Sequence, residues 1–379
     1  MEKVVNKRID GQIDRAYWRG KRVLITGHTG FKGGWLTIWL NRMGCNVTGL
    51  SLAPVTQPTL FQLAKISGLC ENYFCDIRDA HKIKSVFDQA RPEIVFHLAA
   101  QALVRESYND PLETFSTNTM GTANVLEAIR HSTTVKAALM VTTDKVYRNL
   151  ERLEPYKEQD CLGGHDPYSA SKAASESIIE SYRKSYMTAR GINVASARAG
   201  NVIGGGDWAT DRLVPDAMRA WCAKSSLAIR NPDYIRPWQF VLEPLRAYII
   251  LAQQLATNNQ YACAYNFGPD FKDAASVRQV IELAQRTWGD HSAVHWGQSE
   301  LGLHEAGILR LDTSKSQDEL GIRPVWSIDQ AVKRTVEWYK KQNLGSDALY
   351  LCDCDIKSFE SLALNQQCGG LVQIGKDRI

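Results

Sequence analysis

Val23-Leu24-Ile25-Thr26-Gly27-His28-Thr29-Gly30-Phe31-Lys32-Gly33, near the start of the chain, joins an apolar strand-like run directly to a glycine-rich turn. Trp35 then opens a segment with helical apolar spacing. Glycines at such a strand-to-helix turn allow a tight bend, close approach of a pyrophosphate and close helix packing, because a Cβ would collide at each position. The stretch predicts a dinucleotide-binding turn, with GxxGxxG spacing rather than GxGxxG. A turn with only a structural role is the alternative.

Outward from this turn, short β-rich runs alternate with helical segments. The expected strands are 22–26, 45–52, 93–98, 137–142 and 193–198, and the expected helices are 35–43, 80–90, 117–131 and 169–187. This alternation predicts an α/β fold of the Rossmann type, with a doubly wound parallel sheet. Ligands of such sheets bind at the carboxyl ends of the strands, so the loops after Thr26, Leu98 and Thr142 should face a cofactor.

After Arg198 the pattern becomes less regular and includes Gly204-Gly205-Gly206 and a stretch rich in Pro and Trp. We expect a smaller, C-terminal substrate-binding domain there, with helical spacing at 277–287 and 328–340, followed by a poorly ordered tail at 365–379. The expected division is an N-terminal extension at 1–17, a cofactor-binding domain at 18–198, a mainly substrate-binding domain at 199–345 with segments that return to the first domain, and a C-terminal segment at 346–379.

The bulk composition narrows the class of protein. The 379 residues are 44% hydrophobic and 23% charged, which is ordinary for a globular chain, and the net charge of +4 is spread without a basic run. We therefore expect no nucleic-acid partner. Nine cysteines without a CxxC pair predict reduced thiols and no metal site. The charged N-terminus resembles no signal peptide and no apolar stretch approaches membrane-spanning length, so we expect a cytoplasmic protein without a membrane partner.

The second expected strand bears on the choice of cofactor. It ends at Ser51 rather than at the acidic residue that usually holds the adenosine 2′-hydroxyl. No Arg or Lys lies between Cys45 and Thr59 to receive a 2′-phosphate, so NAD is favoured over NADP. Asp76 and Ile77, after a third strand, are candidates for the adenine edge, and a solvated turn is the alternative for Asp76.

Tyr168-Ser169-Ala170-Ser171-Lys172 places a phenol and an ammonium one helical turn apart, so both side chains can reach one ligand. A Tyr has an ordinary pKa of about 10, and a neighbouring Lys⁺ and a positive nicotinamide ring favour its phenolate. Tyr168 would then take a proton from a substrate hydroxyl while hydride leaves the same carbon. Such pairs also occur on solvated helix faces, which is the alternative.

Thr143-Asp144-Lys145 follows another expected strand at its carboxyl end. Thr143 can hydrogen-bond the hydroxyl that is oxidised, and Asp144 and Lys145 add an acid and a possible base, more groups than a simple dehydrogenase requires. An ion pair in a solvated turn is the alternative reading of Asp144 and Lys145.

These motifs, with His97-Leu98-Ala99-Ala100, make the chain resemble an extended short-chain dehydrogenase/reductase, the superfamily of NAD-dependent epimerases and dehydratases. Within it the chain resembles the CDP-glucose 4,6-dehydratases. This likeness rests on Trp18-Arg19-Gly20-Lys21, on 163–168 (GGHDPY), on 198–208 (RAGNVIGGGDW) and on Arg236-Pro237-Trp238-Gln239. It runs from about Trp18 to Tyr339.

The resemblance implies a hydro-lyase with tightly held NAD, acting in deoxysugar biosynthesis for a cell-surface polysaccharide such as the lipopolysaccharide O-antigen. Tyr168, with Lys172 and Thr143, would help to oxidise the sugar's 4-hydroxyl, and Asp144 would protonate the departing 6-hydroxyl. Lys145 would remove the proton on carbon 5 or stabilise the enolate as an ordinary ammonium; the sequence leaves both roles open. The implied cofactor-binding residues are Gly27, Thr29, Gly30, Phe31, Lys32, Gly33, Ser51, Asp76, Ile77, Leu98, Ala99, Ala100, Tyr168 and Lys172.

The resemblance also implies a substrate side for CDP-glucose or another nucleotide sugar. Its expected residues are Arg105, Asn201, Asp207, Trp208, Arg212, Arg230, Arg236, Gln239 and His304. Arg230 and Arg236 are expected phosphate partners, because guanidinium forms paired bonds with phosphate oxygens, although each alone reads as a surface residue. A structural loop pair is the alternative for His304. Phe240 stands where relatives often have His, and its expected effect is loss of a polar substrate contact.

Two other functions share part of this pattern. A nucleotide-sugar 4-epimerase has the same glycine turn, Tyr and Lys, but it needs no acid for a departing hydroxyl. A non-catalytic NAD-binding regulator needs none of Thr143, Asp144, Tyr168 and Lys172. By resemblance we also expect a homo-oligomer, a dimer or tetramer, that pairs helices such as 117–131 and 169–187 across subunits. Their apolar faces fit a core equally well.

Overall fold

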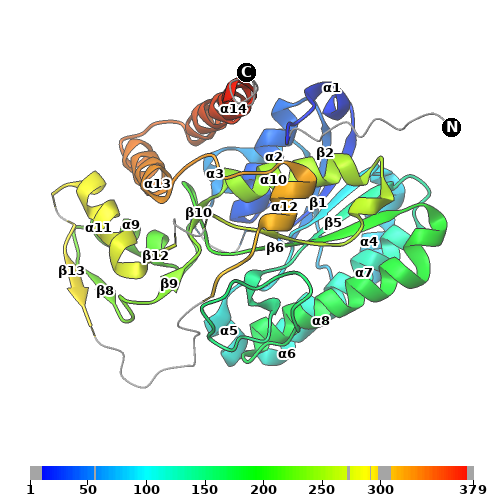
Figure 1. The fold of residues 1–379 in the computed structure, drawn as a ribbon, viewed down its shortest axis with the longest axis horizontal. Coiled ribbons are helices and arrows are strands. Elements are labelled where there is room, and N and C mark those ends of the chain that lie inside the picture. Colours follow the sequence, from blue (N-terminus) through cyan, green and yellow to red (C-terminus); the bar gives the residue numbers. More distant parts are fainter. Residues whose placement is uncertain (1–10, 55–56, 271–273, 291, 298–308, 374–379) are drawn as a thin grey trace.

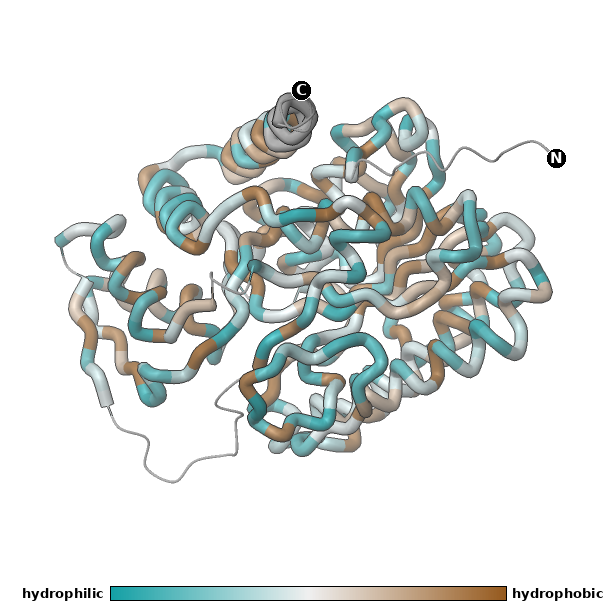
Figure 2. Tube along the Cα trace, in the orientation of Figure 1, coloured by the Kyte–Doolittle hydropathy of each residue, from teal (hydrophilic) through white to brown (hydrophobic). Residues whose placement is uncertain are grey.

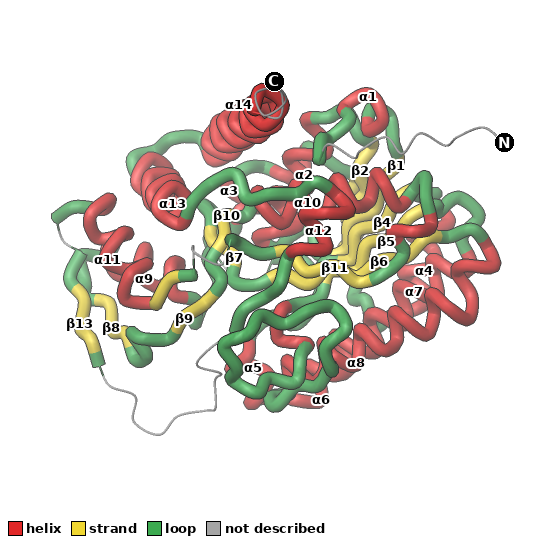
Figure 3. The backbone as a smooth tube through the Cα atoms, in the orientation of Figure 1, coloured by secondary structure: helices red, strands yellow, loops and turns green. Residues whose placement is uncertain are grey.

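A computed structural model describes residues 11–54, 57–270, 274–290, 292–297 and 309–373, with side chains up to residue 365. Its centre is a seven-stranded parallel sheet (Figures 1 and 3). In spatial order the strands are β11 (Ala264–Phe267), β6 (Asn193–Ala199), β5 (Ala137–Val141), β4 (Ile94–His97), β1 (Arg22–Thr26), β2 (Asn46–Ser51) and β3 (Glu71–Phe74). The predicted fold class is confirmed, and each of the five predicted strands is present within one residue at either end.

Helices cover both faces of this sheet, because alternate strand residues bury their side chains in opposite directions. In β1, Val23 and Ile25 belong to one buried cluster and Leu24 belongs to another. The first cluster includes side chains of α2 (Phe31–Arg42), α10 (Leu242–Leu255), α13 (Ile328–Asn343) and α14 (Ala348–Gln373). The second includes side chains of α4 (Ala80–Ala90), α7 (Gly121–His131) and α8 (Pro167–Tyr182). The hydrophobic part of the trace in Figure 2 follows the sheet between these layers.

A smaller lobe lies at the opposite end of the molecule from α4 and α7 (Figure 1). It contains α9 (Leu213–Cys222) and α11 (Val277–Trp288), with β8 (Leu227–Ile229) paired to β13 (Val294–Trp296) and β9 (Ile235–Arg236) paired to β12 (Ala275–Ser276). A third two-stranded pair is formed by β7 (Val202–Ile203) and β10 (Gln239–Phe240), which run parallel to each other. Short helices complete the order: α1 (Arg15–Trp18), α3 (Leu60–Leu63), α5 (Val104–Asn109), α6 (Pro111–Phe115) and α12 (Ser314–Leu320).

Three helical predictions need adjustment. The helix expected at 35–43 begins at Phe31, because Gly33 and Gly34 are part of its first turns rather than of the preceding loop. The helices expected at 117–131 and 169–187 each include a π-helical turn, at Ser116–Met120 and Arg183–Met187. The tail expected from residue 365 is wrong up to Gln373, because α14 continues to that residue. In the described part of the chain, no helix combines the length and the apolar character that crossing a membrane requires.

Candidate active site

One large cavity of about 1010 Å³ opens at the carboxyl edge of the sheet and extends to the smaller lobe. Its lining includes Gly27 after β1, Leu98 after β4 and Thr142 after β5. The strand order changes direction between β1 and β4, and such a switch point is where doubly wound sheets bind ligands. The three loops that were predicted to face a cofactor therefore line one cavity.

The glycine turn has the shape of a phosphate cradle. Gly27 has φ +82°, and an ideal Cβ there would lie 2.7 Å from the backbone nitrogen of Ala99. A Cβ on Gly33 would lie 2.1 Å from the Gly27 carbonyl oxygen. The N-cap of α2 is Gly30, which offers no side-chain acceptor, so the helix's first N–H groups remain available to an anion. This backbone fits the pyrophosphate of NAD.

All fourteen expected cofactor-binding residues line this cavity. At the end of β2, the hydroxyls of Ser51 and Thr29 are 2.8 Å apart, and Thr29 Oγ1 also donates to the Leu52 carbonyl oxygen at 3.0 Å. At the end of β2, where related folds usually carry an acidic residue, this chain therefore has the neutral hydroxyls of Ser51 and Thr29. Their individual contacts with a cofactor stay predictions.

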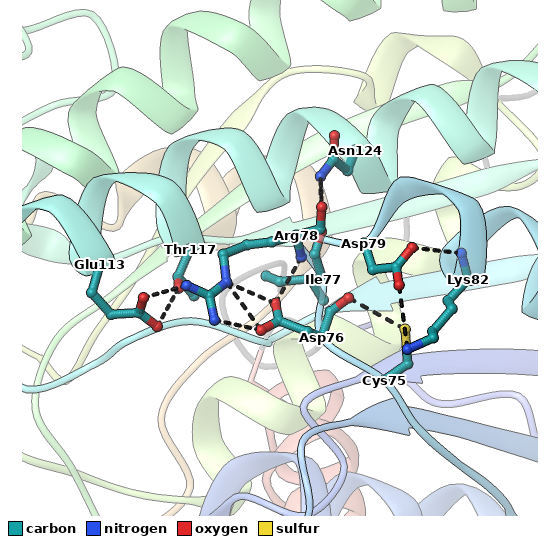
Figure 4. Close-up of polar contacts among 9 residues, drawn as sticks. All are labelled: Cys75, Asp76, Ile77, Arg78, Asp79, Lys82, Glu113, Thr117 and Asn124. Atoms are coloured by element: carbon teal, nitrogen blue, oxygen red, sulfur yellow. Dashed lines mark hydrogen bonds and ion pairs between the residues drawn. The ribbon is translucent and has the colours of Figure 1, made fainter.

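Asp76 lies on the cavity wall, but its carboxylate is already engaged (Figure 4). It accepts hydrogen bonds from the backbone nitrogen of Arg78 at 2.8 Å and from the Arg78 guanidinium at 2.6–3.0 Å. These bonds lower the pKa of Asp76. Arg78 also pairs with Glu113 on α6. Only part of the Asp76 acceptor capacity is left for an adenine edge, and that contact remains a prediction.

Tyr168 and Lys172 both line the cavity from α8, whose start is fixed by the Asp166 side chain accepting from the Ser169 backbone nitrogen at 2.9 Å. Lys172 Nζ donates to the Val141 carbonyl oxygen at 3.0 Å. Burial lowers the pKa of Lys172 to about 8 and raises the pKa of Tyr168 to about 12, while a hydrogen bond with Thr143 opposes the rise for Tyr168. A cationic cofactor ring beside Tyr168 would favour its phenolate further.

Asp144 is buried at the same edge of the cavity, with 2% of its surface exposed. Thr143 Oγ1 donates to Asp144 Oδ1 at 3.0 Å, whereas Oδ2 has no hydrogen-bond partner among the described residues. Burial raises the pKa of Asp144. A carboxyl group with a raised pKa and an unused oxygen is suited to donate a proton to a substrate. Lys145 lines the same cavity.

Lys32 was predicted with the cofactor set, and the structure also brings it close to the catalytic residues. Burial lowers its pKa to about 8, and its other electrostatic neighbours are Arg212, Asp144, Lys172 and Asp207. Three cationic side chains, Lys32, Lys172 and Arg212, therefore approach one another from different parts of the chain. Sequence spacing gave no sign of this convergence.

The expected substrate residues divide into two groups. Six of them line the cavity: Arg105, Asn201, Asp207, Arg212, Arg230 and Arg236. Arg212 Nη1 donates to Asp207 Oδ2 at 2.8 Å, and Arg105 pairs at 3.2 Å with Asp211, a residue of the smaller lobe. The lining also includes Tyr108 on the short helix α5, and Asn231 and Tyr234 between β8 and β9. The sequence did not single them out, because they belong to no motif with a recognisable spacing.

Three of the expected substrate residues do not line the cavity or cannot be placed. Trp208 packs edge-on against Tyr339, with ring centres 5.1 Å apart. The Gln239 side chain donates instead to the Phe267 carbonyl oxygen at 3.4 Å. Trp208 and Gln239 are therefore not among the residues that line the cavity, and their contacts with a substrate stay predictions. His304 lies outside the described residues.

Phe240 is also corrected. Its side chain is fully buried and packs against Trp35 and Trp326, with ring centres 6.0 and 4.7 Å away. It does not line the cavity. The expected loss of a polar substrate contact is wrong for this position, because the position belongs to the hydrophobic core.

Comparisons with known proteins agree with this arrangement. A model of the GDP-mannose 4,6 dehydratase family matches residues 24–335. A CDP-glucose 4,6-dehydratase of Salmonella typhimurium strain LT2 is 44% identical over 356 residues, which cover 92% of this chain and 99% of that protein. The structure of a UDP-glucose 4-epimerase from Thermotoga maritima with UDP-glucose matches with TM-score 0.73 and 23% identity, covering 84% of this chain and 99% of the other. A Thermus thermophilus UDP-glucose 4-epimerase in complex with NAD matches with TM-score 0.72 and 25% identity, covering 84% and 98%.

Proposed function

This chain belongs to the GDP-mannose 4,6 dehydratase family, and we propose that it is an NAD-dependent hydro-lyase that converts CDP-D-glucose to CDP-4-dehydro-6-deoxy-D-glucose. The observation that carries the proposal is the buried Asp144, with a raised pKa and an unused Oδ2, beside Tyr168 in one cavity. Dehydration needs such an acid for the departing hydroxyl, whereas 4-epimerisation does not. The 44% identical relative is named a CDP-glucose 4,6-dehydratase, which supports CDP-glucose as the substrate.

The chain's own residues divide the work. Tyr168 takes the proton from the sugar's 4-hydroxyl, Lys172 supplies positive charge that favours the Tyr168 phenolate, and Thr143 holds the hydroxyl. Asp144 protonates the departing 6-hydroxyl, and Lys145 either removes the carbon 5 proton or stabilises the enolate. NAD, held by the glycine turn and the Ser51 edge, supplies reversible hydride storage. Arg230 and Arg236, which line the cavity, bind the diphosphate through their guanidinium groups.

We also propose a cytoplasmic homo-oligomer, with residues 199–345 mainly reading the sugar nucleotide. The eight cysteines whose side chains the structure describes are all free thiols, which fits a reducing compartment. Leu112 on α6, Met120 and Tyr186 are exposed large apolar side chains near the helices expected to pair across subunits. Light scattering after size exclusion would measure the mass; a monomer at micromolar concentration would contradict the oligomer.

The substrate proposal is tested by product mass. The purified protein is incubated with CDP-glucose, without and with added NAD, and then with UDP-, GDP- and dTDP-glucose. We expect CDP-glucose to lose one water and to do so fastest. Water loss fastest from another nucleotide sugar would overturn the CDP assignment, and an isomer of unchanged mass would make the protein an epimerase.

A further inference from the structure

Glu176 lies on α8 one turn beyond Lys172 and two turns beyond Tyr168, on the same buried side of the helix. Its side chain is 4% exposed and accepts four hydrogen bonds. Oε1 accepts from Thr142 Oγ1 at 2.5 Å and from Arg198 Nε at 3.0 Å. Oε2 accepts from Ser196 Oγ at 2.8 Å and from Arg198 Nη2 at 2.9 Å. A carboxylate with this many fixed donors has one orientation.

Arg198 on β6 extends the same network. Its Nη1 donates to the Tyr147 hydroxyl at 2.8 Å and to the Glu158 carbonyl oxygen at 3.1 Å. The Tyr147 hydroxyl in turn donates to Asn266 Oδ1 at 2.6 Å. The ion pair of Glu176 and Arg198 is thus hydrogen-bonded to Thr142 through Glu176 and to Tyr147 through Arg198.

Those two residues bracket the catalytic loop. Thr143, Asp144 and Lys145 lie between them, and all three line the cavity. The network therefore ties the helix that carries Tyr168 and Lys172 to both ends of the loop that carries the acid. None of the network's five side chains Glu176, Arg198, Tyr147, Thr142 and Ser196 was singled out as functional in the sequence, because they share no local spacing.

The network also acts on the site through charge, because the Glu176 carboxylate lies one helical turn from Lys172. Burial alone would raise the pKa of Glu176, but Arg198 and the hydrogen bonds from Thr142 and Ser196 hold it below its ordinary value. Burial lowers the pKa of Lys172, and the Glu176 carboxylate opposes that fall. Other ionisable groups also act on this region: Lys32 on α2 acts on Lys172, Glu158 acts on Arg198 and Tyr147, and Glu180 on α8 acts on Glu176. Burial lowers the pKa of His97 on β4 to about 3, so His97 is neutral.

The geometry points to Glu176 as a positioning residue that, through Arg198 and Thr142, fixes the helix of Tyr168 and Lys172 against the loop of Thr143 and Asp144. This inference rests on the proposed function for its catalytic consequence. Its structural consequence, a loop held from α8, does not depend on which sugar nucleotide is used. Catalytic groups misplaced by about 1 Å lose rate by about 100-fold.

The test compares Glu176→Gln with Glu180→Gln. Glu180 lies one turn further along α8, is half exposed and forms an ion pair with Lys184, while Arg183 and Glu176 act on it electrostatically. In Glu176→Gln we expect kcat to fall about 100-fold with KM for the sugar nucleotide within about threefold. The alkaline limb of the kcat profile should move to lower pH, because Lys172 loses its charge earlier without the carboxylate. Glu180→Gln should match the wild type in all three measurements.

Hydrogen exchange supplies a readout without substrate. In Glu176→Gln, the amides of 142–147 should exchange at least tenfold faster than in the wild type, while those of β1 and β4 stay unchanged. Tyr147→Phe, which keeps the ion pair, should accelerate the same segment less. Wild-type exchange at 142–147 together with wild-type kcat in Glu176→Gln would overturn the inference. Amide exchange that is faster by the same factor over the whole sheet, in both Glu176→Gln and Tyr147→Phe, would show a purely structural role and would also overturn the inference. A wild-type protein that dehydrates no sugar nucleotide would refute the proposed function, while the exchange data would still decide the positioning.

Discussion

An ideal Cβ on Gly33 would lie 2.1 Å from the carbonyl oxygen of Gly27. The first turn of α2 therefore approaches the end of β1 more closely than any other residue type would permit. This approach brings the helix N-terminus to the cavity, where its free N–H groups can bind an anion.

Gly33→Ala is expected to weaken NAD binding by at least tenfold, because the helix start must move away from Gly27. Gly68→Ala is the matched control, since a Cβ on Gly68 meets nothing within 4 Å. Isothermal titration with NAD measures both, and circular dichroism checks that each variant is folded. Wild-type affinity in folded Gly33→Ala would contradict the cradle.

Tyr168→Phe should lower kcat by about 10²–10⁴-fold, because the 4-hydroxyl loses its proton acceptor. NAD affinity should remain close to that of the wild type, since the ring and its packing are kept. Stopped assays of product mass and a binding titration give the two numbers. A variant that keeps its turnover would show that another group is the base.

Asp144→Asn should separate oxidation from elimination. The amide cannot protonate the departing 6-hydroxyl, so we expect loss of product by about 100-fold or more. Tyr168 and Lys172 remain, and the absorbance of reduced cofactor should rise when substrate is added. If Asp144→Asn forms an isomer of the sugar nucleotide as fast as the wild-type protein turns over, the enzyme is an epimerase.

The dehydration rate should fall on the alkaline side. Asp144 acts in its protonated form and burial raises its pKa, so it loses its function as pH rises past that raised value. Lys172, with a pKa lowered to about 8, loses its charge in the same direction. The kcat profile of Lys172→Arg should extend to higher pH, because a guanidinium stays charged. Alkaline limbs that coincide in the wild type and in Lys172→Arg would contradict the assignment to Lys172.

Phe240→His should change stability and leave substrate choice alone. An imidazole packed against Trp35 and Trp326 would replace an apolar ring in the core, and a buried polar group without a partner costs about 1–3 kcal/mol. Denaturant unfolding measures that loss. The preference among nucleotide sugars, from competing substrates in one reaction, should match the wild type. An altered preference would return Phe240 to the substrate side.

Local signals made much of this structure predictable. The run from Val23 to Gly33 predicted a strand, a turn and a helix, because glycine spacing and apolar alternation are local properties. Tyr168 and Lys172 were found for the same reason, since i and i+4 on a helix share a face.

Contacts made by tertiary folding were not predictable in this way. The Glu176 network joins α8, β6 and the loop after β5, and only the parallel register brings these segments together. Trp208 and Gln239 belong to sequence blocks that carry the family resemblance, yet neither lines the cavity, and Phe240, which departs from the family pattern, packs in the core. The sequence blocks that resemble the family therefore identified the family more reliably than they identified the residues that line the cavity.

The central claim is that Tyr168 and Asp144 act in turn on one sugar, so that the hydrogen leaving carbon 4 returns to carbon 6. CDP-glucose deuterated at carbon 4 tests this most directly, with the product analysed by NMR and mass spectrometry. We predict loss of one water and deuterium in the new methyl group at carbon 6. Deuterium kept at carbon 4 of an isomer with unchanged mass would contradict the account, as would a methyl group whose added hydrogen comes only from solvent.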